Sequence, residues 1–345
     1  MSRNSSLLPA PLLEELSYRS ILITGANGLV GSTLIDALMR QVKECRVFAM
    51  CRNRGKAEKR FAAYIGKKNF NLIIQDVCEP LNEKIHLDFL VHAASPAHPT
   101  AFSAEPVQVM RANLLGTINL LEYCKGTNTR FLLISTGEIY GESRESADSF
   151  TEQDTGYLNS MDFRSCYPES KRAAETLCAS YLRQYGTDTV VARLCYVYGP
   201  NVIEENDRAD AQFLRKAVSG ENIVLKSAGE QVRTYCYVKD AVAALLTILL
   251  KGKSGEAYNI ADKDSILSIR RYAETLCRFA GVSLNFELPD CIEQKGYSKI
   301  PRSVLNAEKL EALGWRPQYT LEEGLKETLL EAARKKEKPD DSQSQ

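Results

Sequence analysis

Three evenly spaced glycines, Gly25, Gly28 and Gly31, are the feature that most constrains how this chain folds. They follow the short apolar run 20–24 and precede a segment, 29–38, whose apolar residues recur at helical spacing. Glycine lets a chain turn tightly, admits phosphates close to the N–H groups at a helix N-terminus, and lets that helix pack closely on a sheet. The segment therefore predicts a strand, a phosphate-binding turn and a helix. A glycine-rich turn without a ligand is the alternative.

The same rhythm of strand and helix continues over the first 200 residues. Further strands are predicted at 46–50, 72–75, 89–92, 131–135 and 189–194, and helices at 56–64, 107–124 and 167–185. Alternating strands and helices form a parallel sheet that is covered on both faces. We therefore predict an α/β protein in which residues 20–200 form a doubly wound parallel sheet, a Rossmann domain.

After Pro200 the rhythm becomes irregular, which predicts a smaller second unit. Its expected elements are helices at 211–218, 240–250 and 269–280, a strand at 223–226 and a segment at 257–260. We assign residues 201–330 mainly to a smaller C-terminal substrate-binding lobe, with some segments returning to the Rossmann half. Residues 1–19 are expected to form an N-terminal appendage with a short amphipathic helix. The charged composition of 331–345 predicts a disordered tail.

Composition and charge favour a small-molecule ligand. With 44 basic and 44 acidic residues the net charge is zero, so nothing attracts the whole protein to nucleic acid or to a membrane surface. The chain has no apolar run long enough to span a bilayer, and its start lacks the apolar core of a signal peptide, so we expect a cytoplasmic protein. The ten cysteines contain no C-x-x-C pair and the three histidines lack ligand spacing. Neither disulfides nor a metal site is expected.

A tyrosine and a lysine four residues apart, Tyr167 and Lys171, are predicted to lie on one face of a helix. A nearby positive charge stabilises a phenolate, so the pKa of the tyrosine is expected to fall and its oxygen to accept a proton from an alcohol. Such a pair can arise by chance among 16 tyrosines. Its position gives it weight, because Ser135 and Thr136 end a predicted strand earlier in the chain.

The order of glycine turn, strand-end hydroxyl and Tyr-x-x-x-Lys resembles the short-chain dehydrogenase/reductase superfamily. From about residue 20 to 317 the chain is similar to the extended branch, the NAD-dependent epimerase/dehydratase family, which acts on nucleotide sugars. This similarity rests on the segments 92–97, 113–117, 139–141, 198–200, 231–238 and 238–240. Within the family, the Ala-Ser-Pro-Ala run at 94–97 and the segment 164–177 most resemble UDP-glucuronate decarboxylases.

The resemblance implies a tightly bound NAD(P)+ that is regenerated in each turnover. The residues expected to bind it are Gly25, Asn27, Gly28, Leu29, Val30, Gly31, Arg52, Asp76, Val77, Ala93, Ala94, Ser95, Asn113, Ser135, Tyr167 and Lys171. Arg52 and Arg54 stand where a carboxylate would bind free ribose hydroxyls, so they favour NADP; solvated basic residues at a helix start are the alternative. Asp76 is expected either at the adenine amine or in a turn.

The resemblance also assigns four catalytic residues: Thr136, Glu138, Tyr167 and Lys171. Tyr167 would remove the proton of a C4 hydroxyl, Thr136 would hydrogen-bond that oxygen, and Lys171 would tune Tyr167 and hold the nicotinamide ribose. The residues expected to contact the substrate are Ser95, Glu138 and Arg233, the last as a bidentate partner of an anion. A loop-capping role for Glu138 and a plain surface charge at Arg233 are the alternatives.

The reaction itself stays open, because three reactions share the oxidation of C4. A carboxylate on C5 leads to decarboxylation, a hydroxymethyl group leads to 4,6-dehydration with Glu138 as base, and rotation of the keto sugar leads to a 4-epimer. Gly137 stands where dTDP-glucose dehydratases carry the aspartic acid that protonates the leaving hydroxyl, so decarboxylation is the first choice. GDP-mannose dehydratases manage without that aspartate, so dehydration is weakened but not excluded. Tyr196 also replaces an asparagine of relatives, which puts the nucleotide-sugar contacts there in doubt.

Two further expectations concern partners. The predicted helices 107–124 and 167–185 have apolar positions on more than one face and resemble the helices through which this family dimerises, so we expect a homodimer built on a four-helix bundle. A nucleotide-diphosphate sugar is the expected small-molecule partner, and neither nucleic acid nor a membrane is expected. A nucleotide-binding protein that has lost turnover is the alternative from another class.

Overall fold

A parallel seven-stranded sheet forms the centre of the molecule. The computed structural model describes residues 8–142, 148–203, 205–287 and 300–337. The strand order is β10-β6-β5-β4-β1-β2-β3, and every neighbouring pair is parallel. The strands are β1 (Ser20–Thr24), β2 (Arg46–Cys51), β3 (Phe70–Ile74), β4 (Phe89–His92), β5 (Arg130–Thr136), β6 (Thr189–Leu194) and β10 (Ala257–Ile260). The predicted Rossmann-type α/β fold is therefore confirmed.

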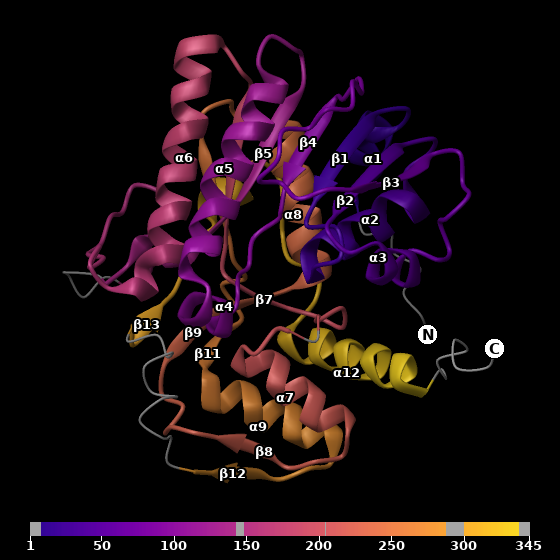
Figure 1. Ribbon diagram of the computed structural model, residues 1–345. Coiled ribbons are helices and arrows are strands. Elements are labelled where there is room, and N and C mark those ends of the chain that lie inside the picture. The colour runs from indigo at the N-terminus through magenta and orange to yellow at the C-terminus, as the bar shows by residue number, and fades with distance from the viewer. Residues whose placement is uncertain (1–7, 143–147, 204, 288–299, 338–345) are drawn as a thin grey trace.

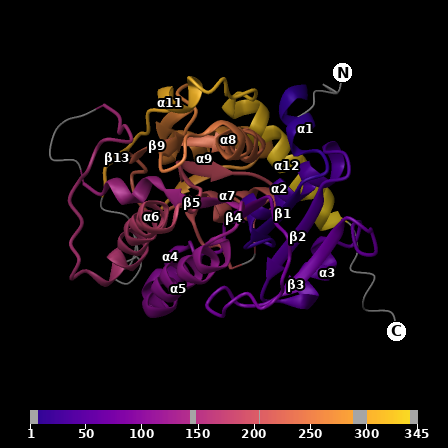
Figure 2. The ribbon, with the colours of Figure 1, turned by 90° about the horizontal axis from the view of Figure 1, so that it is seen from above.

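Helices cover both faces of this sheet, and two separate cores result (Figures 1 and 2). Alternate residues of β1 divide between them: Ile21 and Ile23 belong to one core, and Leu22 belongs to the other. Helices of the first core are α1 (Ala10–Leu16), α2 (Leu29–Gln41), α3 (Arg54–Arg60) and α8 (Val238–Lys251), and those of the second are α5 (Pro106–Cys124) and α6 (Cys166–Tyr185). Burial on both faces explains why the strands read as short continuous apolar runs.

A smaller lobe lies beside the sheet, below it in Figure 1. Its strands are β7 (Tyr196–Tyr198), β8 (Ile223–Leu225), β9 (Val232–Tyr237), β11 (Ile266–Ser268), β12 (Leu284–Phe286) and β13 (Arg302–Ser303). Its helices include α7 (Ala209–Val218), α9 (Ile269–Ala280) and α12 (Leu321–Glu337). Stacked tyrosines form part of its core; the rings of Tyr235 and Tyr272 are 4.6 Å apart. Chain order and spatial unit differ here, because β10 and α8 follow residue 200 yet belong to the large sheet.

The predicted disordered tail begins too early. Residues 331–337 continue α12, so the prediction of disorder is wrong for them, and residues 338–345 lie outside the described residues. The helix forms because Leu325 is fully buried in the core of the small lobe and Leu329 packs against that core. Basic side chains in its last turn, Lys335 and Lys336, favour the negative end of the helix dipole. The many charged side chains of this segment led to the prediction of disorder, whereas apolar side chains earlier in the same helix hold it against the small lobe.

Within the described residues, we find no helix with the length and apolar character that a membrane crossing requires. The appendage helix α1 packs into the first core, where Leu12 and Leu16 are buried together with Leu8, which precedes the helix. Contacts between α1 and α8 place it on the same face of the sheet as α2.

Candidate active site

The glycine turn lies at the carboxyl edge of the sheet, between β1 and α2. Gly25 has φ +64°, and a Cβ atom there would lie 2.7 Å from the carbonyl oxygen of Ala93. A Cβ at Gly31 would lie 2.5 Å from the carbonyl oxygen of Gly25. Neither position can hold a side chain without a shift of the backbone. The α2 helix begins at Leu29 without a side-chain cap, so its first N–H groups are open to an anionic ligand.

Polar atoms around this turn fit a bound cofactor. Ala93 and Ala94 donate their backbone N–H groups to Thr24 Oγ1, at 3.2 and 3.1 Å, which ties the end of β4 to the end of β1. In the part of the chain that the structure describes, Asn27 Oδ1, Ser95 Oγ and Asn113 Oδ1 are buried and have no hydrogen-bond partner. Buried polar atoms are nearly always satisfied, so these three oxygens are suited to a polar ligand. All three had been assigned to the cofactor from the sequence.

The predicted adenosine end of the site lies at the ends of β2 and β3. Arg52 Nη1 is 3.7 Å from Asp76 Oδ2, and the two side chains are 74% and 40% exposed. An exposed ion pair of this kind is worth little, so Arg52 is available to a ligand. Arg54 instead pairs with Glu58, one turn along α3. The other predicted residues of this region are Leu29 and Val30, which begin α2, and Val77, which is buried against Gly116 of α5.

The predicted catalytic residues come together where β5 meets α6. Thr136 ends β5, Tyr167 is the second residue of α6, and Lys171 lies one turn further along. The Thr136 hydroxyl lies close enough to the Tyr167 phenol to lower the pKa of that phenol. Lys171 Nζ donates to the carbonyl oxygen of Ile134 at 2.8 Å. The ring of Phe102, 4.8 Å away and stacked, holds the tyrosine in place.

Burial dominates the ionisation of this pair. Burial raises the pKa of Tyr167, and Arg208 gives the largest opposing effect. The expected fall in the pKa of this tyrosine through Lys171 is therefore wrong for the protein without ligand, because desolvation of the phenolate is the larger effect. Burial also lowers the pKa of Lys171 to about 8, with Glu175 opposing that fall. The phenol is thus neutral at neutral pH, beside an ammonium that is close to losing its proton.

A small, partly open pocket lies beside these residues. It is lined by Thr136, Gly137, Glu138, Leu194, Cys195, Tyr196, Arg208 and Ser303. Thr136 and Glu138 were predicted here, and Tyr196 is the residue that departs from relatives. Arg208 and Ser303 were missed. Arg208 comes from a polar loop just before α7, and the only sequence signal for it is a basic residue at the start of a predicted helix.

Glu138 is paired rather than free. Its Oε2 lies 2.8 Å from Nη2 of Arg164, and both side chains are less than one fifth exposed. The Arg164 guanidinium in turn lies 4.4 Å from the centre of the Phe102 ring. Sequence reasoning missed Arg164 because its partner is 26 residues away along the chain.

The structure does not bring two predicted side chains into this pocket. Arg233 is 2% exposed and donates to the carbonyl oxygens of Val232 and Ile300, at 2.9 and 2.8 Å. Its guanidinium lies behind the pocket, 5.4 Å from the ring of Tyr196. Ser135 donates its hydroxyl to Glu175, so a contact of Ser135 with the cofactor would have to come from its backbone. Substrate binding by Arg233 stays a prediction.

The chain is similar to known proteins over most of its length. The NAD dependent epimerase/dehydratase family model matches residues 21–261. UDP-glucuronic acid decarboxylase 1 of Xenopus tropicalis is 35% identical over 327 residues, 93% of this chain and 74% of that protein. UDP-glucose 4-epimerase of Thermotoga maritima, solved with UDP-glucose, is 26% identical with a TM-score of 0.77, covering 92% of this chain and 99% of that chain.

A third relative carries the cofactor. dTDP-glucose 4,6-dehydratase of Streptomyces venezuelae, solved with NAD bound, is 25% identical with a TM-score of 0.79, covering 91% of this chain and 97% of that chain. The glycine turn, the unpartnered polar oxygens around it and the Thr136–Tyr167–Lys171 cluster are thus found on the fold of enzymes that modify nucleotide sugars. This chain belongs to the NAD-dependent epimerase/dehydratase family.

Proposed function

We propose that this protein is a cytoplasmic enzyme that decarboxylates a nucleotide-linked uronic acid, with UDP-glucuronate as the first candidate. The observation that carries the proposal is the pocket lined by Thr136, Gly137, Glu138 and Arg208. Arg164 pairs with Glu138 at its edge, and the Tyr167 phenol feels the positive charges of both Arg164 and Arg208. A uronic acid linked to a nucleotide diphosphate is an anion at both ends. Relatives at 35% and 33% identity named UDP-glucuronic acid decarboxylases support this choice.

The chemistry begins with the hydroxyl pair. Tyr167, as phenolate, would accept the proton of the C4 hydroxyl while Thr136 holds the same oxygen by a hydrogen bond. Nicotinamide, when bound, supplies the hydride acceptor that makes C4 a ketone and later returns the hydride. The glycine turn 25–31, Ser95, Asn113 and Lys171 would hold this cofactor. A ketone at C4 is β to a carboxylate on C5 and accepts the electron pair when CO₂ leaves.

Packing around Gly137 favours decarboxylation over 4,6-dehydration. A Cβ atom at this position would lie 3.0 Å from Cδ1 of Leu305, which is a buried core residue. An aspartic acid here would therefore require Leu305 to shift. Loss of water from C6 needs an acid to protonate the leaving hydroxyl, whereas loss of CO₂ does not. The pocket thus lacks a group that only the dehydratase reaction uses at this position.

Mass spectrometry of the products tests the reaction. We expect the protein, incubated with NAD+ and UDP-glucuronate, to give a product lighter by about 44 mass units, and neutral nucleotide hexoses to stay unchanged. Loss of about 18 mass units from a neutral hexose, with UDP-glucuronate untouched, would establish a 4,6-dehydratase instead. An isomer of unchanged mass, separated by chromatography, would establish an epimerase.

The cofactor preference follows from Arg52. A guanidinium that is three quarters exposed at the end of β2 suits a 2′-phosphate, so we propose that NADP binds more tightly than NAD. Arg52→Asp should reverse the order, by roughly tenfold or more in the ratio of dissociation constants. Calorimetric titration of both cofactors measures this ratio. Arg270→Asp is the control, because Arg270 is also exposed but lies on α9 of the small lobe, away from the end of β2. Equal affinities that Arg52→Asp leaves unchanged would discard the preference for NADP.

We also propose a homodimer that forms through α5 and α6. These helices lie side by side on the outside of the sheet (Figures 1 and 2). Along α5, Val107 is 66% exposed, Met110 38% and Leu115 36%. Apolar side chains so exposed on one helix favour burial against a second copy. Light scattering at micromolar concentration should therefore give twice the chain mass of 38.5 kDa.

Substitution in α5 tests the site of dimerisation. Val107→Asp combined with Met110→Asp should give a monomer, because a charge buried in the interface is costly. Ile65→Asp is the control, since Ile65 is 48% exposed but lies beyond α3, away from α5. A wild-type protein that stays monomeric at this concentration would refute the dimer. A double variant that stays dimeric would show that the interface does not include this part of α5.

A further inference from the structure

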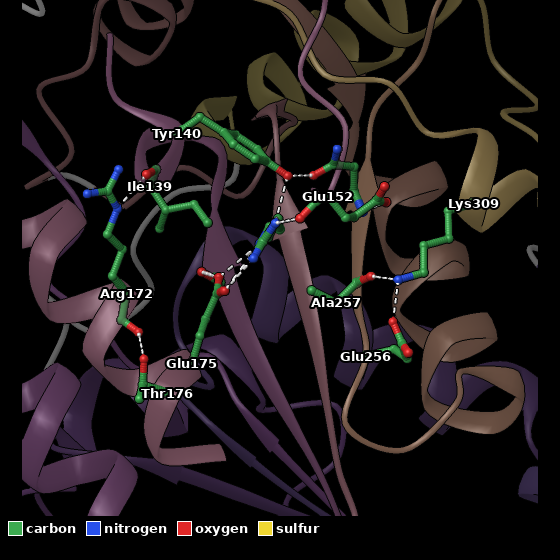
Figure 3. A network of polar contacts seen from close by, with 12 residues as sticks. Ile139, Tyr140, Glu152, Arg172, Glu175, Thr176, Glu256, Ala257 and Lys309 are labelled. Carbon is green, nitrogen blue, oxygen red and sulfur yellow. Dashed lines mark hydrogen bonds and ion pairs between the residues drawn. The ribbon is translucent and has the colours of Figure 1, made fainter. Parts of the chain in front are cut away.

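A half-buried ion pair lies directly behind the catalytic residues. Arg193 of β6 binds the carboxylate of Glu175 of α6, with Nη2 2.7 Å from Oε2, and each side chain is 13% exposed. The Nε atom of Arg193 reaches both carboxylate oxygens at 3.2 Å. Ser135 donates its hydroxyl to Oε1 of the same carboxylate at 2.5 Å. Figure 3 shows Glu175 at the centre of this network.

Three side chains of α6 lie against three consecutive residues of β5. Lys171 binds the carbonyl group of Ile134, Glu175 binds the hydroxyl of Ser135, and the Tyr167 phenol lies close to the hydroxyl of Thr136. The three side chains are four residues apart, so they share one face of the helix. Glu175 is the member of this set that has no assigned role in catalysis. Its contact is nevertheless the one that joins the helix to the residue next to Thr136.

The network continues from Arg193 to the loop that carries Glu138. Arg193 Nη1 donates to the phenol oxygen of Tyr140 at 2.9 Å, and Tyr140 donates to Asn259 Oδ1 at 2.7 Å. Tyr140 ends the short helix η1 (Gly137–Tyr140), in which Glu138 is the second residue. Asn259 also donates to the carbonyl oxygen of Asn306, at 3.0 Å. Glu175 is thus connected, through Arg193 and Tyr140, to the short helix that carries Glu138.

We propose that Glu175 is a positioning residue of the active site, which aligns α6 with the end of β5 and supplies the negative charge that keeps the Lys171 ammonium protonated. The proposal deepens the proposed function, since it concerns the same Tyr167–Lys171 pair. Neither part requires Glu175 to touch the substrate.

The charges around Lys171 support the electrostatic part. On α6 the ammonium is near Tyr167, Glu175 and Cys178, and from β4 it faces His92. Burial raises the pKa of the Cys178 thiol and of the Tyr167 phenol, so both are neutral. Burial also lowers the pKa of His92 to about 3, so this ring is neutral as well. Glu175 is therefore the neighbour whose carboxylate opposes the desolvation of the Lys171 ammonium.

Glu175→Gln tests the proposal, because it keeps the shape and removes the charge. Lysine labelled with carbon-13 at Cε reports the titration of each ammonium by NMR, and the Lys171 signal is the one that Lys171→Met removes. In the wild type we expect this signal to titrate near pH 8. In Glu175→Gln its midpoint should fall by roughly one pH unit. Cofactor reduction by UDP-glucuronate should then slow by about twofold at pH 7 and by about tenfold at pH 9, in proportion to the protonated fraction of Lys171, with KM changed less than twofold.

Glu256→Gln is the matched control. Glu256 pairs with Lys309 at 2.7 Å beside β10, as Figure 3 shows, but the contacts of this pair run to Ala257 and not to β5 or α6. Its loss should leave the Lys171 midpoint and the reaction rate unchanged. In the pH profile of kcat/KM, one apparent pKa should be lower in Glu175→Gln than in the wild type. The same apparent pKa should be unchanged in Glu256→Gln.

Should Glu175→Gln fail to fold because Arg193 is left unpaired, Glu175→Gln combined with Arg193→Gln removes both charges together. A Lys171 midpoint that stays at its wild-type value in whichever variant folds would overturn the proposal. A wild-type protein that never turns over UDP-glucuronate, in which Glu175→Gln still shifts the lysine midpoint, would instead refute the proposed function and uphold the role of Glu175.

Discussion

Tyr167→Phe should abolish turnover of every nucleotide sugar while leaving the fold intact. The substitution removes one oxygen, and the ring can keep its stacking on Phe102. Without that oxygen nothing accepts the proton of the C4 hydroxyl, and a positioned general base contributes about 10²- to 10⁴-fold. We therefore expect the rate of cofactor reduction, followed by the absorbance of reduced nicotinamide, to fall by about 10³-fold.

Tyr181→Phe is the matched control for this variant. Tyr181 lies on the same helix, and its hydroxyl donates to Glu122 at the protein surface. Its loss should not change the rate. Circular dichroism and cofactor affinity should be the same in both variants as in the wild type. A Tyr167→Phe protein that retains a tenth of the wild-type rate would mean that another group takes the proton.

Local sequence signals were sufficient for six of the seven strands of the large sheet, all but β10. The run 20–24 reads as a continuous apolar strand because β1 is buried on both faces, and the glycines after it have no room for a side chain. Such signals depend only on residues that are adjacent in the sequence, so they can be interpreted without knowledge of the tertiary structure. The small lobe was harder to predict, because short strands such as β9 and β11 obtain their burial from partners distant in the chain.

The site residues show the same difference between local sequence signals and tertiary packing. Thr136, Tyr167 and Lys171 were predicted because they occupy fixed positions on one strand and one helix. Arg164 and Arg208 were not, because they come from irregular segments whose position depends on tertiary packing. The direction of the pKa shift of Tyr167 was missed for a related reason. Spacing shows that a lysine is near, but only the fold shows that burial outweighs it.

Arg208→Met should lower the activity, whereas Arg233→Met should mainly lower the stability of the fold. Arg208 lines the pocket, where its guanidinium can bind an anionic substrate. Its loss should therefore lower kcat/KM by roughly 10²-fold, which corresponds to the loss of a hydrogen bond to a charged group. Arg215→Met is the control, because Arg215 is a partly exposed arginine of α7 whose guanidinium binds the carbonyl oxygen of Asn206. That variant should keep the wild-type kcat/KM. Steady-state kinetics with UDP-glucuronate measure all three.

Arg233→Met should instead weaken the fold. Its guanidinium satisfies the buried carbonyl oxygens of Val232 and Ile300 and joins β9 to the segment that leads into β13. Leaving such groups unpaired should cost about 2–4 kcal/mol in the free energy of unfolding, measured by urea titration, with kcat/KM of the folded protein changed less than about tenfold. An Arg233→Met protein with wild-type stability and a large loss of affinity would show the reverse: that Arg233 leaves these carbonyl groups to bind the substrate, and that residues 300–301 move when it does.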